Sequence, residues 1–82
     1  MTDGELIEDQ VRGCLSGVVG RRVLPGETVV RGEEPAWDSL AHVELLFALE
    51  DEFGIRFDRD ELGSMGSLRD LVDSVARHRG HP

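Results

Sequence analysis

A long apolar run that begins directly after an Asp-Ser pair constrains the fold of this chain more than any other stretch. From Leu40 to Phe53 the apolar residues recur at helical spacing, with Asp38 and Ser39 immediately before them. Asp and Ser favour helix N-termini because their side-chain oxygens accept hydrogen bonds from the unpaired backbone N–H groups of the first turn. The sequence therefore predicts a helix over residues 39–53, with Ser39 exposed at its mouth and Gly54 at its end.

Two further stretches, residues 3–19 and 67–78, carry apolar residues at helical spacing, and Asp58 can cap a brief helical turn over residues 59–62. No strand pattern and no repeat accompanies them. A chain of 82 residues is long enough for one small domain. We therefore expect a single all-α domain over residues 1–82, an up-and-down bundle of three main helices plus one short helix.

The connection between the first two long helices runs from Arg21 to Trp37 and shows no sustained period. It contains both Gly and Pro. Four of its apolar residues are expected to hold it against the helices; they are Val23, Leu24, Val29 and Val30. We expect this connection to carry the chain from the far end of the first helix to the start of the next, which suggests that the first and second helices run antiparallel.

The charge of the chain restricts its partners. Seventeen acidic residues against nine basic ones give a net charge of −8, which disfavours binding to nucleic acid and to anionic membranes. It favours a basic protein partner. The single cysteine, Cys14, fits a helical core position, and with three scattered His residues it forms no metal-binding pattern. No signal peptide or membrane-spanning run is visible. We expect a cytoplasmic monomer without a metal ion.

The expected helix 39–53 carries two apolar stripes when it is drawn at roughly 100° per residue. The first stripe suits a core and consists of Leu45, Leu46, Leu49 and Phe53, with His42 among them. The second consists of Leu40, Val43 and Phe47 and is bordered by carboxylates, namely Glu44, Glu50 and Asp51. Apolar surface edged with charge is typical of a recognition patch. The alternative is that a four-helix bundle buries both stripes.

The exposed serine has several possible roles. Asp38, Ser39 and His42 supply the residue types of a catalytic triad. Residues so close on one helical turn align poorly for proton relay, and no nucleophile elbow surrounds the serine. We therefore expect no catalytic residues. Ser39 could instead be a plain helix cap, part of an acidic interaction module without a prosthetic group, or a covalent attachment point whose phosphodiester the helix N-terminus stabilises.

The stretch from Trp37 to Ile55, WDSLAHVELLFALEDEFGI, resembles the core of an acyl carrier protein. The likeness rests on the Asp-Ser-Leu triplet, the spacing of the apolar residues and the Val-Glu-Leu sequence at 43–45. It also rests on the acidic residues just before Phe53 and on Ile55. The resemblance implies that Ser39 is esterified by 4′-phosphopantetheine, which a separate phosphopantetheinyl transferase donates from coenzyme A. The terminal thiol of this arm then holds acyl cargo as a thioester, so the chain would be a carrier and not an enzyme.

The resemblance also assigns a surface for partner enzymes that load, condense or modify the cargo through basic docking patches. Its positions in this chain are Asp38, Leu40, Val43, Glu44, Phe47, Glu50 and Asp51.

Some positions differ from carriers of fatty-acid synthesis. Ala41 stands where those carriers commonly have an acid, and Arg56 and Arg59 interrupt the acidic run. Trp37 and His42 resemble discrete carriers of specialised pathways, which favours polyketide or related biosynthesis. A housekeeping fatty-acid carrier and an aminoacyl carrier remain the alternatives.

Overall fold

The computed structural model describes residues 3–80, with side chains described for residues 6–79. Its elements are α1 (Asp3–Val19), the 3₁₀ turn η1 (Arg31–Glu33), α2 (Ser39–Phe53), α3 (Arg59–Leu62) and α4 (Leu68–Gly80). The predicted all-α class, with three main helices and a short one, is confirmed. Only the last helix differs from its predicted bounds, since it begins one residue later and ends two residues later than expected.

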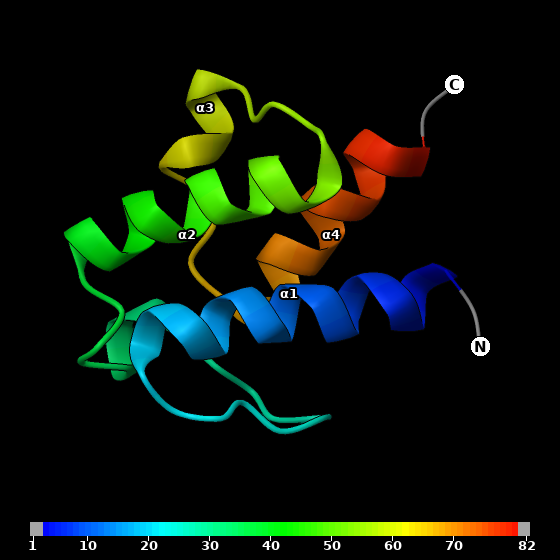
Figure 1. Cartoon of the computed structure of the whole chain (residues 1–82). Coiled ribbons are helices and arrows are strands. Elements are labelled where there is room, and N and C mark those ends of the chain that lie inside the picture. The colour runs from blue at the N-terminus through cyan, green and yellow to red at the C-terminus, as the bar shows by residue number, and fades with distance from the viewer. Residues whose placement is uncertain (1–2, 81–82) are drawn as a thin grey trace.

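The long helices α1 and α2 lie side by side and run in opposite directions, as Figure 1 shows from the blue-to-cyan α1 and the green α2. The antiparallel pairing expected from the long connection is thus confirmed. Helix α1 also packs against α4, whereas α2 and α4 touch much less. The core lies between these three helices, and its fully buried residues there are Val11, Leu15, Leu45, Leu49, Leu71 and Val75.

The connection between α1 and α2 is fastened to the start of α4. Val30 forms an isolated antiparallel bridge with Ser67. Val23 and Val29 are buried, as predicted. The prediction for Leu24 is wrong, because this side chain is 54% exposed. Its backbone turns at the surface, where the Leu24 N–H donates to the Glu27 carboxylate over 2.9 Å, and the side chain points away from the core.

Helix α2 begins and ends where its sequence predicts. Oδ1 of Asp38 accepts the Ala41 N–H over 2.8 Å, which makes Asp38 the N-cap. At the other end Gly54 adopts a left-handed conformation with φ of 65° and donates its N–H to the Glu50 carbonyl. A residue with a Cβ atom would be strained in this conformation. These two caps fix the position of Ser39 as the first residue of the helix.

The single cysteine, Cys14, lies on α1, is half-buried and packs against the core. Burial, and next the negative charge of Glu52, raises the pKa of its thiol, which disfavours the reactive thiolate. Within residues 3–80, no helix is both long and apolar enough to cross a membrane.

Candidate functional site

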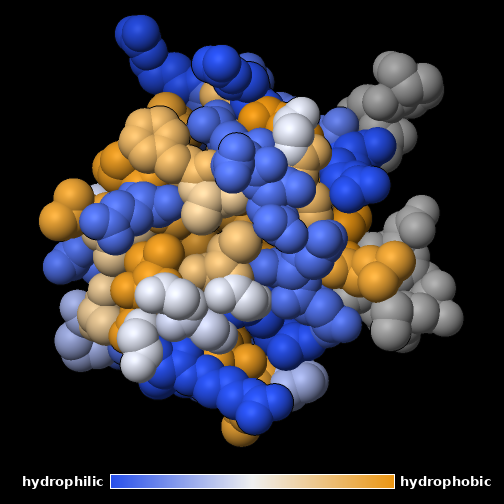
Figure 2. All heavy atoms as spheres, viewed as in Figure 1, coloured by the Kyte–Doolittle hydropathy of each residue, from blue (hydrophilic) through white to orange (hydrophobic). Residues whose placement is uncertain are grey.

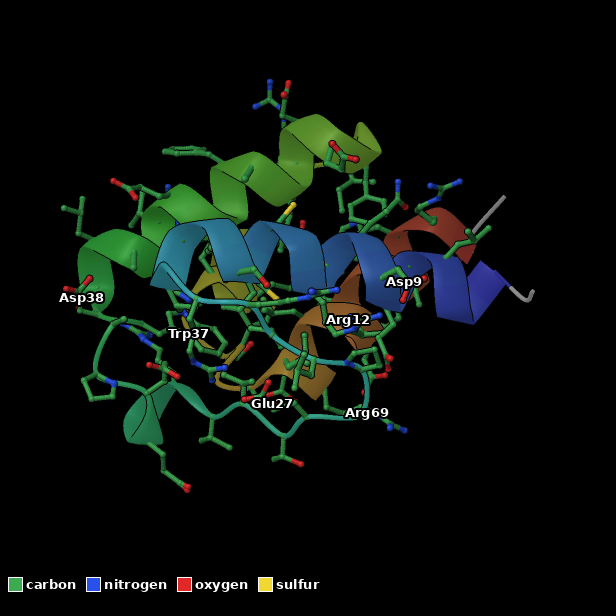
Figure 3. The ribbon with its side chains drawn as sticks, turned by 60° about the horizontal axis from the view of Figure 1, so that its bottom comes forward. Asp9, Arg12, Glu27, Trp37, Asp38 and Arg69 are labelled. Atoms are coloured by element: carbon green, nitrogen blue, oxygen red, sulfur yellow. The ribbon has the colours of Figure 1, made fainter. Side chains whose placement is uncertain are left out.

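Ser39 lies exposed at the start of α2. Figure 3 shows its neighbour Asp38 at this end of the helix, while Trp37 lies further inside. Because the Asp38 carboxylate caps the helix, the Ser39 hydroxyl is not needed for capping. The interpretation of Ser39 as a plain helix cap is therefore wrong. Its hydroxyl remains accessible for other chemistry.

His42 does not form a catalytic pair with Ser39, because both of its ring nitrogens are bonded elsewhere. The Trp37 Nε1–H donates to His42 Nδ1 over 3.0 Å. An indole can only donate, so Nδ1 must be the acceptor and the ring proton lies on Nε2. Nε2 in turn donates to the Leu62 carbonyl over 2.9 Å. With its ring buried, His42 is a structural residue, as its position within the core stripe predicts.

The Trp37–His42 pair is neutral at physiological pH. Burial lowers the pKa of His42, which outweighs the opposite effect of the hydrogen bond to the Leu62 carbonyl. The nearby charge of Arg31 also lowers this pKa. A protonated ring would present an N–H to the indole N–H, so the network requires the neutral imidazole.

The burial of Trp37 is a feature that the helical pattern did not reveal. Its side chain is only 1% exposed, although it lies outside any helix and one residue before the exposed Asp38. The indole anchors the end of the connection in the core, and through His42 it is tied to α2 and to the end of α3. It thereby fixes the backbone immediately before the serine.

The second apolar stripe of α2 is exposed, so the alternative in which a bundle buries both stripes is wrong. Leu40, Val43 and Phe47 are 69%, 48% and 66% exposed. Figure 2 shows apolar atoms among charged groups on the face that carries α2. The first stripe is buried at Leu45, Leu46 and Leu49, with Phe53 half-buried against the core. Helix α2 therefore uses one stripe for the fold and presents the other.

The carboxylates beside the exposed stripe differ in their surroundings. Glu44 and Asp51 are exposed. Glu50 is half-buried, and its carboxylate accepts the Phe57 N–H over 2.8 Å. This contact stabilises the link that follows α2. Glu50 therefore has a structural role as well as an exposed edge. A helical wheel cannot reveal this role because Phe57 lies beyond the helix.

A basic side chain also reaches the serine. Nη2 of Arg31, the first residue of η1, donates to Ser39 Oγ over 3.3 Å. The two residues belong to different elements, so their proximity does not follow from any helical pattern.

Comparison with known proteins gives a consistent set of relatives. Acyl carrier protein 3 of Ralstonia nicotianae is 33% identical over 69 residues, which cover 82% of this chain and 78% of that protein. The acyl carrier protein of Nitratidesulfovibrio vulgaris is 33% identical over 73 residues, which cover 85% of this chain and 93% of that protein. No family model matches the chain, and no solved structure matches it significantly.

Proposed function

Because the chain belongs to the acyl carrier protein family, whose members are carriers and not enzymes, we propose that it bears 4′-phosphopantetheine on Ser39. The observation that supports this most is the exposed serine at a capped helix start, directly beside an exposed apolar stripe. When bound, the arm would supply a terminal thiol that holds acyl groups as thioesters. The chain itself would contribute an attachment point and a recognition surface.

The residues around Ser39 fit an esterified phosphate. The hydroxyl is exposed, so a transferase can reach it. The buried Trp37 and the Asp38 cap hold the backbone on its N-terminal side, so the oxygen has a defined place. The positive end of the α2 dipole favours a negative group there. These contacts support attachment at this residue and give the modifying enzyme a rigid target.

We further propose that partner enzymes bind the exposed stripe of Leu40, Val43 and Phe47 together with Glu44 and Asp51. The apolar side chains would supply contact area, and the carboxylates would attract basic patches on a phosphopantetheinyl transferase and on loading, condensing and modifying enzymes. Asp38 and Glu50 flank this surface, with part of their hydrogen-bonding capacity used within the fold. Such docking should be weak and fast, as a shuttle requires.

The loading experiment tests the carrier function directly. Unmodified protein is incubated with coenzyme A and a broad-specificity phosphopantetheinyl transferase, and its intact mass is measured. The expected result is the gain of one phosphopantetheine per chain. A wild-type protein that gains no such mass would overturn the proposal and favour the acidic interaction module without a prosthetic group.

For the pathway, we propose polyketide or related specialised biosynthesis. The buried Trp37–His42 pair and the Ala41 position support this choice. The relatives named simply as acyl carrier proteins are equally consistent with a second candidate, housekeeping fatty-acid synthesis, and an aminoacyl cargo is the third. The mass of the arm-bound species in protein isolated from its native host separates the three, because extender units, fatty acyl chains and amino acids differ in composition.

Charge reversal on the proposed surface should slow partner reactions. Replacing Glu44 or Asp51 by Lys is expected to slow modification by the natural transferase roughly tenfold at low salt, since it removes electrostatic attraction. Helicity by circular dichroism should stay unchanged because both side chains are exposed. Glu52→Lys makes the same charge change on another side of α2 and is the matched control. Equal rates of modification for all three variants would show that Glu44 and Asp51 do not belong to the interface.

A further inference from the structure

Arg31 is placed to interact with whatever is bonded to Ser39. Its Nη2 lies 3.3 Å from Ser39 Oγ. A guanidinium is always charged and can donate two parallel hydrogen bonds to the oxygens of a phosphate. A guanidinium in contact with the hydroxyl oxygen is also within reach of a group esterified to that oxygen.

The backbone around Arg31 holds it in this place. The Arg31 N–H donates to the Gly66 carbonyl over 2.9 Å, which fastens η1 to the start of α4. The Glu34 N–H donates to the Arg31 carbonyl, and the Trp37 N–H donates to the Glu34 carbonyl over 3.0 Å. With Trp37 buried, this series of contacts returns the chain to Ser39. The proximity of Arg31 and Ser39 is therefore built into the fold.

A negative group on Ser39 would be repelled by nearby carboxylates and stabilised by a nearby cation. The neighbouring Asp38 carboxylate is already negative, and the whole chain carries −8. Among the described side chains, no carboxylate lies within ion-pair distance of Arg31, whereas Arg21 of the same connection is held by Glu27 and Glu34. The charge of Arg31 reaches the first turn of α2, since it adds to burial in lowering the pKa of His42. Arg31 is thus an available cation at the serine.

We propose that Arg31 binds the phosphodiester on Ser39 and supplies its counter-charge. In this way it would position the phosphate end of the phosphopantetheine arm over the start of α2. The ligand class is a phosphate ester monoanion. The inference rests on the proposed function for the identity of this group. The preference for an anion at position 39 is nevertheless a property of the unmodified chain and can be measured there.

The first experiment uses unmodified protein and a double-mutant cycle. Ser39→Asp places a carboxylate at the serine, and its effect on the folding equilibrium is measured by urea unfolding in the wild-type and Arg31→Gln backgrounds. We expect Ser39→Asp to be more favourable with Arg31 present, by roughly twofold to fivefold in the equilibrium constant, and this difference to fade at high salt. Arg56→Gln, an exposed charge loss beyond the opposite end of α2, should leave the effect of Ser39→Asp unchanged.

The second experiment uses protein loaded with 4′-phosphopantetheine by a broad-specificity transferase. The phosphorus-31 resonance of the phosphodiester is compared in wild type, Arg31→Gln and Arg56→Gln. We expect a shifted resonance in Arg31→Gln only, because removal of the guanidinium changes the hydrogen bonding of the phosphate oxygens.

The outcomes separate this inference from the proposed function. Coupling between positions 31 and 39 in a chain that takes up no arm would support the anion site and overturn the carrier role. Normal loading, with no coupling in the cycle and equal phosphorus resonances in all three proteins, would overturn the role of Arg31 and leave the carrier role intact.

Discussion

Ser39→Ala is expected to abolish attachment of 4′-phosphopantetheine completely, because it removes the only oxygen of this residue that can be esterified. The variant should fold normally. Asp38, and not Ser39, caps α2, and an exposed first-turn residue that makes no buried contact contributes no more than about 0.5 kcal/mol. Intact mass after incubation with coenzyme A and a broad-specificity transferase measures the loss, and urea unfolding checks the fold.

The matched control is Ser64→Ala. Ser64 is also exposed and lies in the loop between α3 and α4. Its variant should gain the same mass as wild type. Mass gain by Ser39→Ala would assign the modification to another residue, and loss of mass gain in Ser64→Ala would do the same.

Trp37→Phe is expected to lower the free energy of unfolding by about 1–3 kcal/mol, because His42 Nδ1 would remain buried without its donor. This is a large part of the roughly 5–15 kcal/mol that stabilises a typical domain. The lost indole volume adds to the effect. Urea unfolding followed by far-ultraviolet circular dichroism measures it, since the variant lacks the native fluorophore.

The same network predicts how stability depends on pH. The folded-state pKa of His42 lies below the ordinary value of 6.5, so the unfolded chain takes up a proton first as the pH falls. The stability that neutral His42 contributes is complete above 6.5 and is lost as the pH drops from there through the folded-state pKa. Trp37→Phe removes the indole N–H that opposes protonation, so the difference in stability between wild type and variant should shrink between neutral pH and about 5.5.

Leu71→Ala provides the control for this comparison. It opens a cavity in the core on α4 and should cost about 2–5 kcal/mol, but its pH curve should run parallel to that of wild type. If the stability-versus-pH curves of Trp37→Phe and Leu71→Ala both ran parallel to that of wild type, the assigned tautomer of His42 and its hydrogen bond from Trp37 would be contradicted.

The parts of the fold that could be predicted from the sequence are those governed by neighbours along the chain. The spacing from Leu40 to Phe53, the acid at Asp38 and the glycine at position 54 are local signals, and they predict the bounds of α2 correctly. The helical wheel likewise separates the buried Leu45 and Leu49 from the exposed Phe47, because burial follows the helical period when a helix packs through one face.

The remaining features depend on how the connection and α3 pack, and the helical pattern does not record them. His42 bonds to Leu62, twenty residues further along the chain. Arg31 meets Ser39 where η1 is fastened to the start of α4 and the connection turns into α2. The exposure of Leu24 follows from a surface turn that composition alone does not reveal. The elements were predictable, while the environment of the serine depends on how the connection packs.

The burial of Trp37 has a practical consequence for following this protein in solution. It is the only tryptophan in the chain, and there is no tyrosine, so emission excited at long ultraviolet wavelengths comes from one ring. That ring lies two residues before Ser39 and is shielded from water. The molecule thus carries an intrinsic optical probe beside its proposed attachment point, and events at that end can be observed without any added dye.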